Sequence, residues 1–308
     1  MVATDGDVVR MIDVRQLRTL RALADHGTVV AAAEALYLTP SAVSQQLAIL
    51  SKSTGCELLE RRGRNVVLTE AARVLVTHAD VVFAQLERAQ SDLRAISPAP
   101  MTVRIAGFPT ALMAVVAPAM KTLRGRHPEW GFEISDTESE ESVARLIEGS
   151  IDIAVVMAAP NRPLLGDPRI KIMPLLEEIY VAALPEGHPF AGAESVSLTE
   201  LVEEPFVLAA EGLSCHDQVT AICADAGFQP RGRHRATDFS AALALIANGF
   251  GVSLLPTLGV PAQVPEGVVL VPLKEDWPRR VSLIAMRAGA EHPEVVGALS
   301  EAAARLVR

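Results

Sequence analysis

Cysteine is scarce in this chain of 308 residues, which contains only Cys56, Cys215 and Cys223. An odd number of widely and irregularly spaced cysteines excludes the paired framework that holds small secreted domains together. The N-terminal segment MVATDGDVVR also lacks the basic and then apolar order of a secretory signal. These absences predict a cytoplasmic protein without structural disulfides.

Long apolar runs are missing as well. The stretch Phe239–Pro265 carries no charged residue, but residues that interrupt helices divide it into pieces too short to cross a bilayer. These residues are Asn248, Gly249, Gly251, Pro256 and Pro261. We therefore expect no membrane-spanning segment and no membrane partner.

Signatures of catalysis and of cofactor binding are also absent. The sequence has no glycine-rich phosphate loop and no His/Cys cluster with the spacing of metal ligands. Cys215, His216 and Asp217 are consecutive, but neighbours on one helix point about 100° apart and do not form a triad by themselves. We expect no enzyme activity, no cofactor and no metal, and an α/β enzyme stays open only as an alternative.

The chain lacks the net positive charge that many nucleic-acid-binding proteins have, since its formal net charge is −9. Of its 28 basic and 37 acidic residues, 11 of each lie in residues 1–96, so the acidic excess belongs to the rest. Salt screens charges beyond about 8–10 Å, so a local basic surface is enough for contact with DNA. The overall charge therefore excludes no DNA partner, and the length predicts at least two domains.

Three short helices are predicted near the N-terminus. Residues 15–24 place leucines on one stripe, Thr28 caps a second helix, and Thr39 followed by Pro40 begins a third. The apolar positions of the third helix face the other two helices; they are Val43, Leu47 and Leu50. Its exposed hydroxyl and amide groups are of the kind that bond to base edges and phosphates; they belong to Ser41, Ser44, Gln45 and, in part, Gln46. A polar helix that only packs is the alternative.

The segment Glu57–Thr69 predicts a β-hairpin beside the third helix, because two alternating strands flank a turn at Arg62-Gly63-Arg64. Arginines on such a hairpin reach backbone phosphates or a narrow minor groove. The candidate DNA-binding residues are Thr28, Thr39, Pro40, Ser41, Ser44, Gln45, Gln46, Arg61, Arg62 and Arg64.

Residues 13–73 resemble the winged helix-turn-helix of LysR-type transcriptional regulators of bacteria. Two segments carry the resemblance, RQLRTLRALADHGTVVAAAEALYLTPSAVSQQLAIL and LLERRGRNVVLTEAA. Ser51 and Ala72 depart from the Glu and Gly that are usual in the family. The resemblance implies sequence-specific binding to double-stranded DNA, and it implies homodimers that pair into homotetramers.

Residues 71–97 predict one long linker helix. Its apolar residues alternate in steps of three and four, which is the heptad pattern of a coiled coil; they are Ala72, Leu75, Ala79, Val82, Leu86, Ala89, Leu93 and Ile96. Such a seam packs either on its own domain or on a second copy of the chain. We expect a homodimer, because two related recognition helices can then contact two half-sites on DNA.

Residues 101–308 alternate between predicted strands and helices, and the order repeats once, which favours parallel sheets in two lobes. This part resembles the LysR effector domain, whose two-lobed α/β fold is similar to type 2 periplasmic binding proteins. The expected fold is therefore multidomain α/β. Its domains are a winged helix-turn-helix at 11–70, the linker helix at 71–97, lobe I at about 101–175 and 266–308, and lobe II at about 176–265.

Four hydroxyl side chains lie at predicted helix starts, namely Thr110, Ser139, Ser214 and Ser240. Helix starts converge on the cleft at the carboxyl ends of parallel strands, where their N–H groups favour an anion. Simple capping of the helices is the alternative. By the resemblance, the residues that line the effector site are Thr110, Ser139, Ser214, Cys215, Asp238 and Phe239, and we expect a small anionic effector.

A thiol-based function stays open at EGLSCHDQVTAIC, residues 211–223. This segment resembles the redox loop of peroxide-sensing family members, with Cys223 at the position of their second cysteine. Ser214 stands at the position of their reactive first cysteine, and Cys215 comes one place later. A helix start and His216 would lower the pKa of Cys215. An effector-controlled regulator is the leading hypothesis; a redox-responsive regulator and a pure binding protein are the alternatives.

Overall fold

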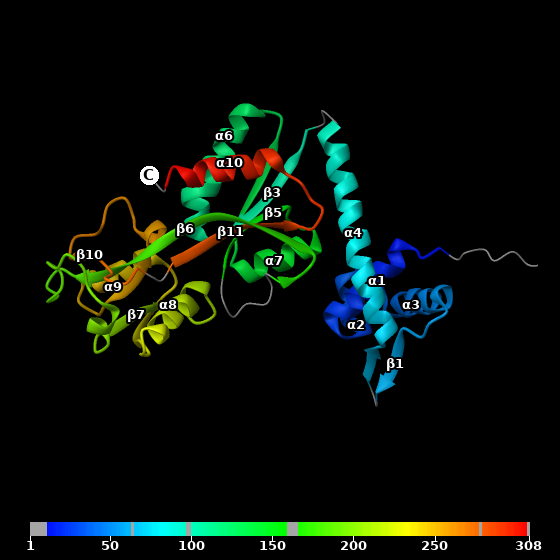
Figure 1. Ribbon diagram of the computed structural model, residues 1–308, viewed down its shortest axis with the longest axis horizontal. Coiled ribbons are helices and arrows are strands. Elements are labelled where there is room, and N and C mark those ends of the chain that lie inside the picture. Colours follow the sequence, from blue (N-terminus) through cyan, green and yellow to red (C-terminus); the bar gives the residue numbers. More distant parts are fainter. Residues whose placement is uncertain (1–10, 63–64, 97–99, 159–165, 277–278, 307–308) are drawn as a thin grey trace, which may run out of the picture. The chain divides into compact units, whose positions relative to one another are not determined.

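The computed structural model describes residues 11–62, 65–96, 100–158, 166–276 and 279–306. The chain divides into two compact units, residues 1–90 and 91–308, whose elements are labelled in Figure 1. Among the described helices, none is both long and apolar enough to cross a membrane. The hairpin predicted at residues 57–69 is called the wing below, and its predicted DNA-binding residue Arg64 lies outside the described residues.

The first unit contains three short helices, a hairpin and most of a long helix. These elements are α1 (Val14–His26), α2 (Val29–Ala35), α3 (Pro40–Thr54), β1 (Leu59–Arg62), β2 (Asn65–Leu68) and α4 (Glu70–Ile96). The predicted caps Thr28 and Thr39 are confirmed, since each hydroxyl accepts a hydrogen bond from the backbone N–H three residues later, at 3.1 and 3.2 Å. Asp13, whose side chain caps α1, was not predicted from the sequence. Gly27 ends that helix at φ 72°, a conformation that glycine adopts without strain.

The predicted heptad seam divides into two parts along α4. Ala72 and Ala79 are buried, and Ala72 and Val76 join the core formed by α1, α2 and α3. Farther along the helix, apolar side chains of the seam are exposed: Val82 by 36%, Leu86 by 43%, Leu93 by 66% and Ile96 by 79%. A short first stretch of the seam therefore packs on its own unit, and the rest lies on the surface.

The second unit is a two-lobed α/β structure. In chain order its elements are β3 (Thr102–Gly107), α5 (Pro109–Ala111), η1 (Leu112–Val116), α6 (Ala117–Arg126), β4 (Gly131–Asp136), α7 (Ser139–Glu148), β5 (Ile153–Met157), β6 (Ile170–Pro185), η3 (Leu198–Leu201), β7 (Pro205–Ala209), α8 (Ser214–Asp225), β8 (Arg231–Ala236), α9 (Phe239–Ala247), β9 (Ser253–Pro256), η4 (Thr257–Gly259), β10 (Val268–Pro272), β11 (Arg279–Arg287) and α10 (Pro293–Ala304). The single helix expected from Thr110 is interrupted by a π-helical turn, η1.

The long strand β6 joins the two lobes. Its first part, through Ile179, pairs with β11, and its second part, from Tyr180 on, pairs with β9 and β10. The expectation of parallel sheets is correct for β3 with β4 and β5 and for β7 with β8, but wrong for the pairs that β6 and β11 form, which are antiparallel. The predicted end of lobe II near residue 265 also differs from the structure, because β10 pairs with β6 there and Val271 belongs to the lobe II core.

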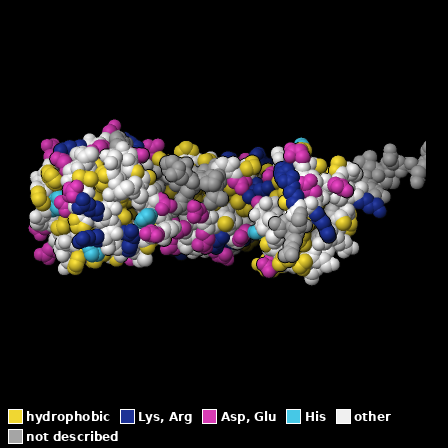
Figure 2. Space-filling model, turned by 90° about the horizontal axis from the view of Figure 1, so that it is seen from below, with side chains coloured by type: hydrophobic (Ala, Val, Ile, Leu, Met, Phe, Trp, Pro, Cys, Tyr) yellow, Lys and Arg dark blue, Asp and Glu magenta, His cyan; other side chains and the backbone are white. Residues whose placement is uncertain are grey.

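Lobe I has three layers. Alternate residues of the central strands face α6 and α10 on one side and α7 on the other, and Figure 1 shows α6 and α10 side by side. In lobe II, α8 packs on one core with β6, β7 and β9, and α9 packs on a second core. On the face drawn in Figure 2, acidic and basic side chains are interspersed over the surface.

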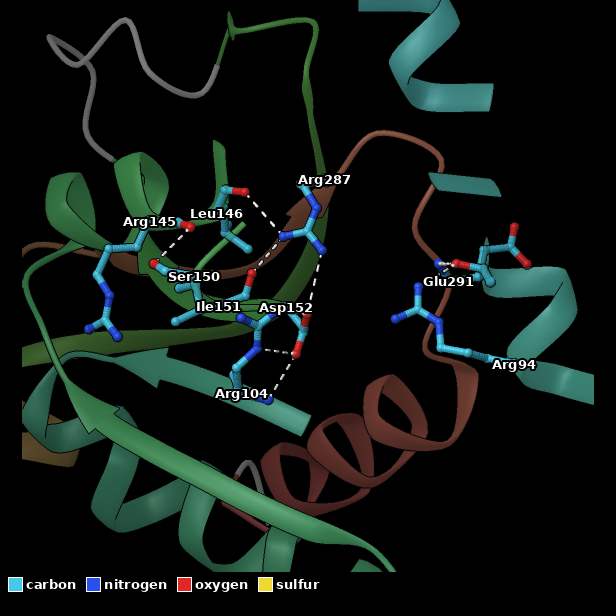
Figure 3. A network of polar contacts seen from close by, with 10 residues as sticks. Arg94, Arg104, Arg145, Leu146, Ser150, Ile151, Asp152, Arg287 and Glu291 are labelled. Carbon is cyan, nitrogen blue, oxygen red and sulfur yellow. Dashed lines mark hydrogen bonds and ion pairs between the residues drawn. The ribbon is translucent and has the colours of Figure 1, made fainter. Parts of the chain in front are cut away.

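The buried carboxylate of Asp152, which directly precedes β5, bonds to residues of the neighbouring strands β3 and β11. Asp152 accepts hydrogen bonds from the backbone N–H of Arg104 at 3.0 Å and from its Nη2 at 2.8 Å, and Arg287 approaches to 3.4 Å (Figure 3). Burial alone would raise the pKa of Asp152, but the hydrogen bonds and charge of Arg104, helped by Arg287, hold this pKa below its ordinary value. The ionised carboxylate therefore stabilises lobe I.

Candidate DNA interface and effector site

The recognition helix α3 presents the polar face that the sequence predicts. Val43, Leu47 and Leu50 are buried against the other helices, whereas the exposed residues include Pro40, Ser41, Ser44 and Gln45. The Ser44 hydroxyl donates to the Pro40 carbonyl at 2.9 Å, which leaves its oxygen available as an acceptor. The amide of Gln45 is exposed, and a glutamine amide is the group that can contact adenine through two hydrogen bonds.

Gln46 is partly exposed, as the sequence predicts, and it also makes a contact that was not predicted. It is half-buried, and its Oε1 accepts a hydrogen bond of 2.5 Å from the hydroxyl of Thr19, which is itself buried. This bond joins α3 to α1. The side-chain carbonyl oxygen of Gln46 therefore helps to hold the two helices together.

The wing carries two described arginines, Arg61 and Arg62, both exposed on β1. Arg62 forms an ion pair with Glu60 at 2.9 Å, in which both side chains are largely solvent-exposed. Exposed pairs of this kind contribute about 0–1 kcal/mol. The pair with Glu60 therefore holds the Arg62 side chain only weakly.

Two further features of this unit were not predicted from the sequence. The hydroxyl of Ser51 accepts a hydrogen bond of 3.2 Å from the backbone N–H of Leu58 and so joins α3 to the segment that enters the wing. Tyr37, in the turn before α3, is 96% exposed and has φ 54°. Positive φ is unfavourable for a bulky residue, so this turn is strained.

The inter-lobe strands carry a fully buried ion pair. Arg280 on β11 and Glu178 on β6 are paired in register, and their side chains are 0% and 3% exposed. Arg280 Nε donates to Glu178 Oε1 at 2.6 Å, and Glu178 Oε2 accepts from the backbone N–H of Leu258 at 2.7 Å. Because β6 passes from one lobe to the other just beyond Glu178, the pair lies at the junction of the lobes.

Two of the three guanidinium nitrogens of Arg280 have hydrogen-bond partners among the described residues. Its Nη2 donates to the hydroxyl of Thr110 at 2.8 Å, and its Cζ lies 5.1 Å from the centre of the Phe108 ring. Among the described residues, the remaining nitrogen, Nη1, is buried without a hydrogen-bond partner. Because a buried, unsatisfied donor on a charged group is costly, Nη1 is suited to bind an acceptor that comes from outside the protein.

The start of α8 contacts lobe I through a carboxylate. Ser214 donates its backbone N–H and its hydroxyl to the same Oε2 of Glu138, at 3.2 and 2.7 Å. The thiol of the next residue, Cys215, interacts with Arg280 through charge and a side-chain hydrogen bond, and the charge of Glu138 also affects it. Thr110 and Cys215 therefore both contact Arg280, and Ser214 directly precedes Cys215.

The other predicted effector residues have local contacts. The Ser139 hydroxyl accepts from the backbone N–H of Met157 at 3.0 Å, Asp238 caps α9 through Ala241, and Phe239 packs in the α9 core. Ser240 does not begin α9, which starts at Phe239. Capping by the side chain explains none of Thr110, Ser139 or Ser214, because their helices have no side-chain cap bond.

The redox alternative required a lowered pKa for the Cys215 thiol, and the shift has the opposite direction. Burial raises the pKa of Cys215 above its ordinary value, and the Glu138 charge raises it further, although Arg280 opposes both effects. Cys223 is fully buried, and burial raises its pKa to about 12. Both thiols are therefore protonated at neutral pH.

Sequence reasoning missed the three charged residues of this site, Glu138, Glu178 and Arg280. A signal was present for two of them, because Glu178 lies within the largely apolar strand IKIMPLLEEIYVAALP and Arg280 is the second residue of the largely apolar strand RRVSLIAMR. A charged residue inside a buried strand needs a partner. Glu138 carries no comparable signal.

Comparisons with known families and proteins cover nearly the whole chain. Residues 14–73 match the family described as "Bacterial regulatory helix-turn-helix protein, lysR family", and residues 98–307 match "LysR substrate binding domain". A protein of Streptomyces viridosporus named "Probable hydrogen peroxide-inducible genes activator" is 30% identical over 302 residues, which are 95% of each chain. A protein of the same name from Mycobacterium avium is 31% identical over 249 residues, 80% of this chain and 78% of that one.

A solved structure has the same fold. The hydrogen-peroxide-bound structure of a cysteine-to-serine mutant of Corynebacterium glutamicum OxyR superimposes with a TM-score of 0.62 at 23% identity, over 96% of this chain and 94% of that one. At this identity the likeness concerns the fold alone.

Proposed function

This chain belongs to the LysR family of bacterial transcriptional regulators, which bind DNA, and we propose that a small anion held between its two lobes controls that binding. The chain acts in the cytoplasm under this proposal. The observation that carries the proposal is the buried guanidinium of Arg280, whose Nη1 has no hydrogen-bond partner among the described residues.

The surroundings of Arg280 favour an anionic ligand. Its charge is already balanced by Glu178, but Nη1 has no acceptor among the described residues, and the thiol of Cys215, in the first turn of α8, interacts with the guanidinium. Thr110 comes from lobe I and Cys215 from lobe II, so a ligand there touches both lobes. It binds one arrangement of the lobes more tightly than another and shifts the population toward that arrangement.

The first unit supplies the DNA contacts in this proposal. Ser41, Ser44 and Gln45 bind base edges and phosphates in the major groove, and Arg61 and Arg62 of the wing bind phosphates. Thr28, Thr39 and Pro40 lie at the exposed starts of α2 and α3 and contact the phosphate backbone of the DNA. The exposed part of the α4 seam pairs with a second copy of the chain, and dimers assemble into tetramers.

Calorimetric titration with small carboxylates and phosphate tests the effector site directly. We expect one class of anion to bind the wild-type protein and Arg280→Gln to weaken this binding at least tenfold, because a charged hydrogen bond contributes about 1.5–3 kcal/mol. Arg279→Gln is the matched control, since Arg279 is the preceding residue but is exposed and pairs with Asp276. An equal loss of anion affinity in Arg280→Gln and Arg279→Gln would contradict a specific role of Arg280.

A thiol-based response is the second candidate, and the names of the relatives favour it. The raised pKa values of Cys215 and Cys223 speak against it, because the thiolate is the reactive form. The two residues are also eight positions apart on α8, about 12 Å along the axis, whereas a disulfide needs Cα atoms within about 7 Å. A peroxide-dependent change in DNA binding that Cys215→Ser abolishes would establish this candidate instead.

A further inference from the structure

The contact between Glu138 and α8 links the lobes at the proposed effector site. Glu138 precedes α7 in lobe I, and its Oε2 accepts both the backbone N–H and the hydroxyl of Ser214, the first residue of α8 in lobe II. Leu213, the residue before α8, provides no side-chain cap. A carboxylate from the other lobe therefore satisfies donors that the start of a helix otherwise leaves unpaired.

The position of this carboxylate is one that an anionic ligand would also favour. The thiol of Cys215, the residue after Ser214, interacts with Arg280 through charge and a side-chain hydrogen bond, and the charge of Glu138 also affects it. Arg280 is completely buried, and its Nη1 is unpartnered among the described residues. An anion bonded to Ser214 in place of Glu138 would therefore lie one residue from Cys215, which itself interacts with the buried guanidinium of Arg280.

We propose that Glu138 is an internal ligand of the effector site, and that a small carboxylate effector acts by displacing it from Ser214. This inference rests on the proposed effector site and adds its chemical class and its control. The effector takes over the two hydrogen bonds from Ser214 and gains the Nη1 donor, which Glu138 leaves unused. Release of Glu138 frees the start of α7 from α8, so occupancy by the effector breaks one link between the lobes.

Competition with an internal ligand lowers the apparent affinity of an external one. The apparent dissociation constant rises in inverse proportion to the fraction of molecules in which the site is open. If Glu138 occupies Ser214 in nine-tenths of the molecules, its removal tightens binding about tenfold.

Acetate is the probe for this competition, because it replaces the atoms that Glu138→Ala removes beyond the β-carbon. We would titrate sodium acetate into wild-type protein and Glu138→Ala at constant ionic strength set with chloride, and follow thermal unfolding. We expect acetate to stabilise Glu138→Ala with a midpoint at least tenfold lower than for the wild type. Glu148→Ala, which removes an exposed carboxylate from the end of the same helix, should behave as the wild type does.

Glu138→Gln and Arg280→Gln distinguish a failure of the internal-ligand proposal from a failure of the proposed effector site. Glu138→Gln keeps an acceptor oxygen without the charge, preserves the fold if Glu138→Ala does not, and should show an intermediate midpoint. Equal midpoints in the wild type and in both Glu138 variants would overturn the internal ligand. The proposed effector site would still stand if Arg280→Gln weakened acetate binding in each background, and it would fail too if Arg280→Gln changed nothing.

Discussion

Removing one partner of the buried pair between Glu178 and Arg280 should destabilise the second unit far more than removing both. In Glu178→Leu the guanidinium of Arg280 loses its carboxylate while it stays buried, which costs about 3–5 kcal/mol. Arg280→Met leaves the Glu178 carboxylate buried with the Leu258 N–H as its nearest donor, at a similar cost. The double variant removes both charges and should lie within about 2 kcal/mol of the wild type.

Urea unfolding followed by tryptophan fluorescence measures these differences. Both tryptophans of the chain, Trp130 and Trp277, belong to residues 91–308, so the signal reports on the second unit. The sum of the two single costs should exceed the cost of the double variant by at least about 2 kcal/mol, a coupling typical of residues in direct contact. Additive costs, or a single variant that costs less than about 1 kcal/mol, would show that the pair is not a buried ion pair in solution.

Three further predictions concern other parts of the chain. Leu86→Glu should weaken self-association at least tenfold in analytical ultracentrifugation by placing a charge in the exposed seam, whereas Gln85→Glu, next to it on α4, should not. Tyr37→Asn should raise the stability of the first unit by roughly 1 kcal/mol in thermal unfolding, because asparagine adopts positive φ more readily; a lower stability would contradict strain at that turn. Because the pKa of Asp152 is lowered on folding, its contribution to stability is present above the ordinary value of 3.8 and lost as pH falls below it. The difference in unfolding free energy between wild type and Asp152→Asn should therefore be constant from pH 7 to 5 and shrink below pH 4, and a pH-independent difference would contradict this assignment.

The first unit could be predicted well from the sequence, because its structure depends on local signals. Thr28, Thr39 and Pro40 begin helices where the chain starts a new apolar period, and Val43, Leu47 and Leu50 define the buried face of α3. Such signals act over three or four residues. The hydrogen bond between Gln46 and Thr19 was not predicted, because the two residues are 27 positions apart.

The effector site could be predicted only in part, because contacts between distant residues define it. Helix starts identified Thr110 and Ser214, but Glu178 and Arg280 are 102 residues apart and Glu138 and Ser214 are 76 apart. Those pairs depend on the register of β6 with β11 and on the packing of two lobes, which no local pattern encodes. The same limit explains why the antiparallel strands β6, β10 and β11 were not anticipated.

The most direct test of the central claim is the effect of a bound carboxylate on DNA affinity. We would measure the dissociation constant for DNA upstream of the protein's own gene, at fixed salt, with and without a carboxylate that calorimetry shows to bind. We expect this ligand to change the wild-type constant by about 5–150-fold, the usual range of allosteric coupling, and to leave the constant of Arg280→Gln unchanged. A wild-type constant that does not change when the site is saturated, or an equal change in Arg280→Gln, would contradict control of DNA binding through Arg280.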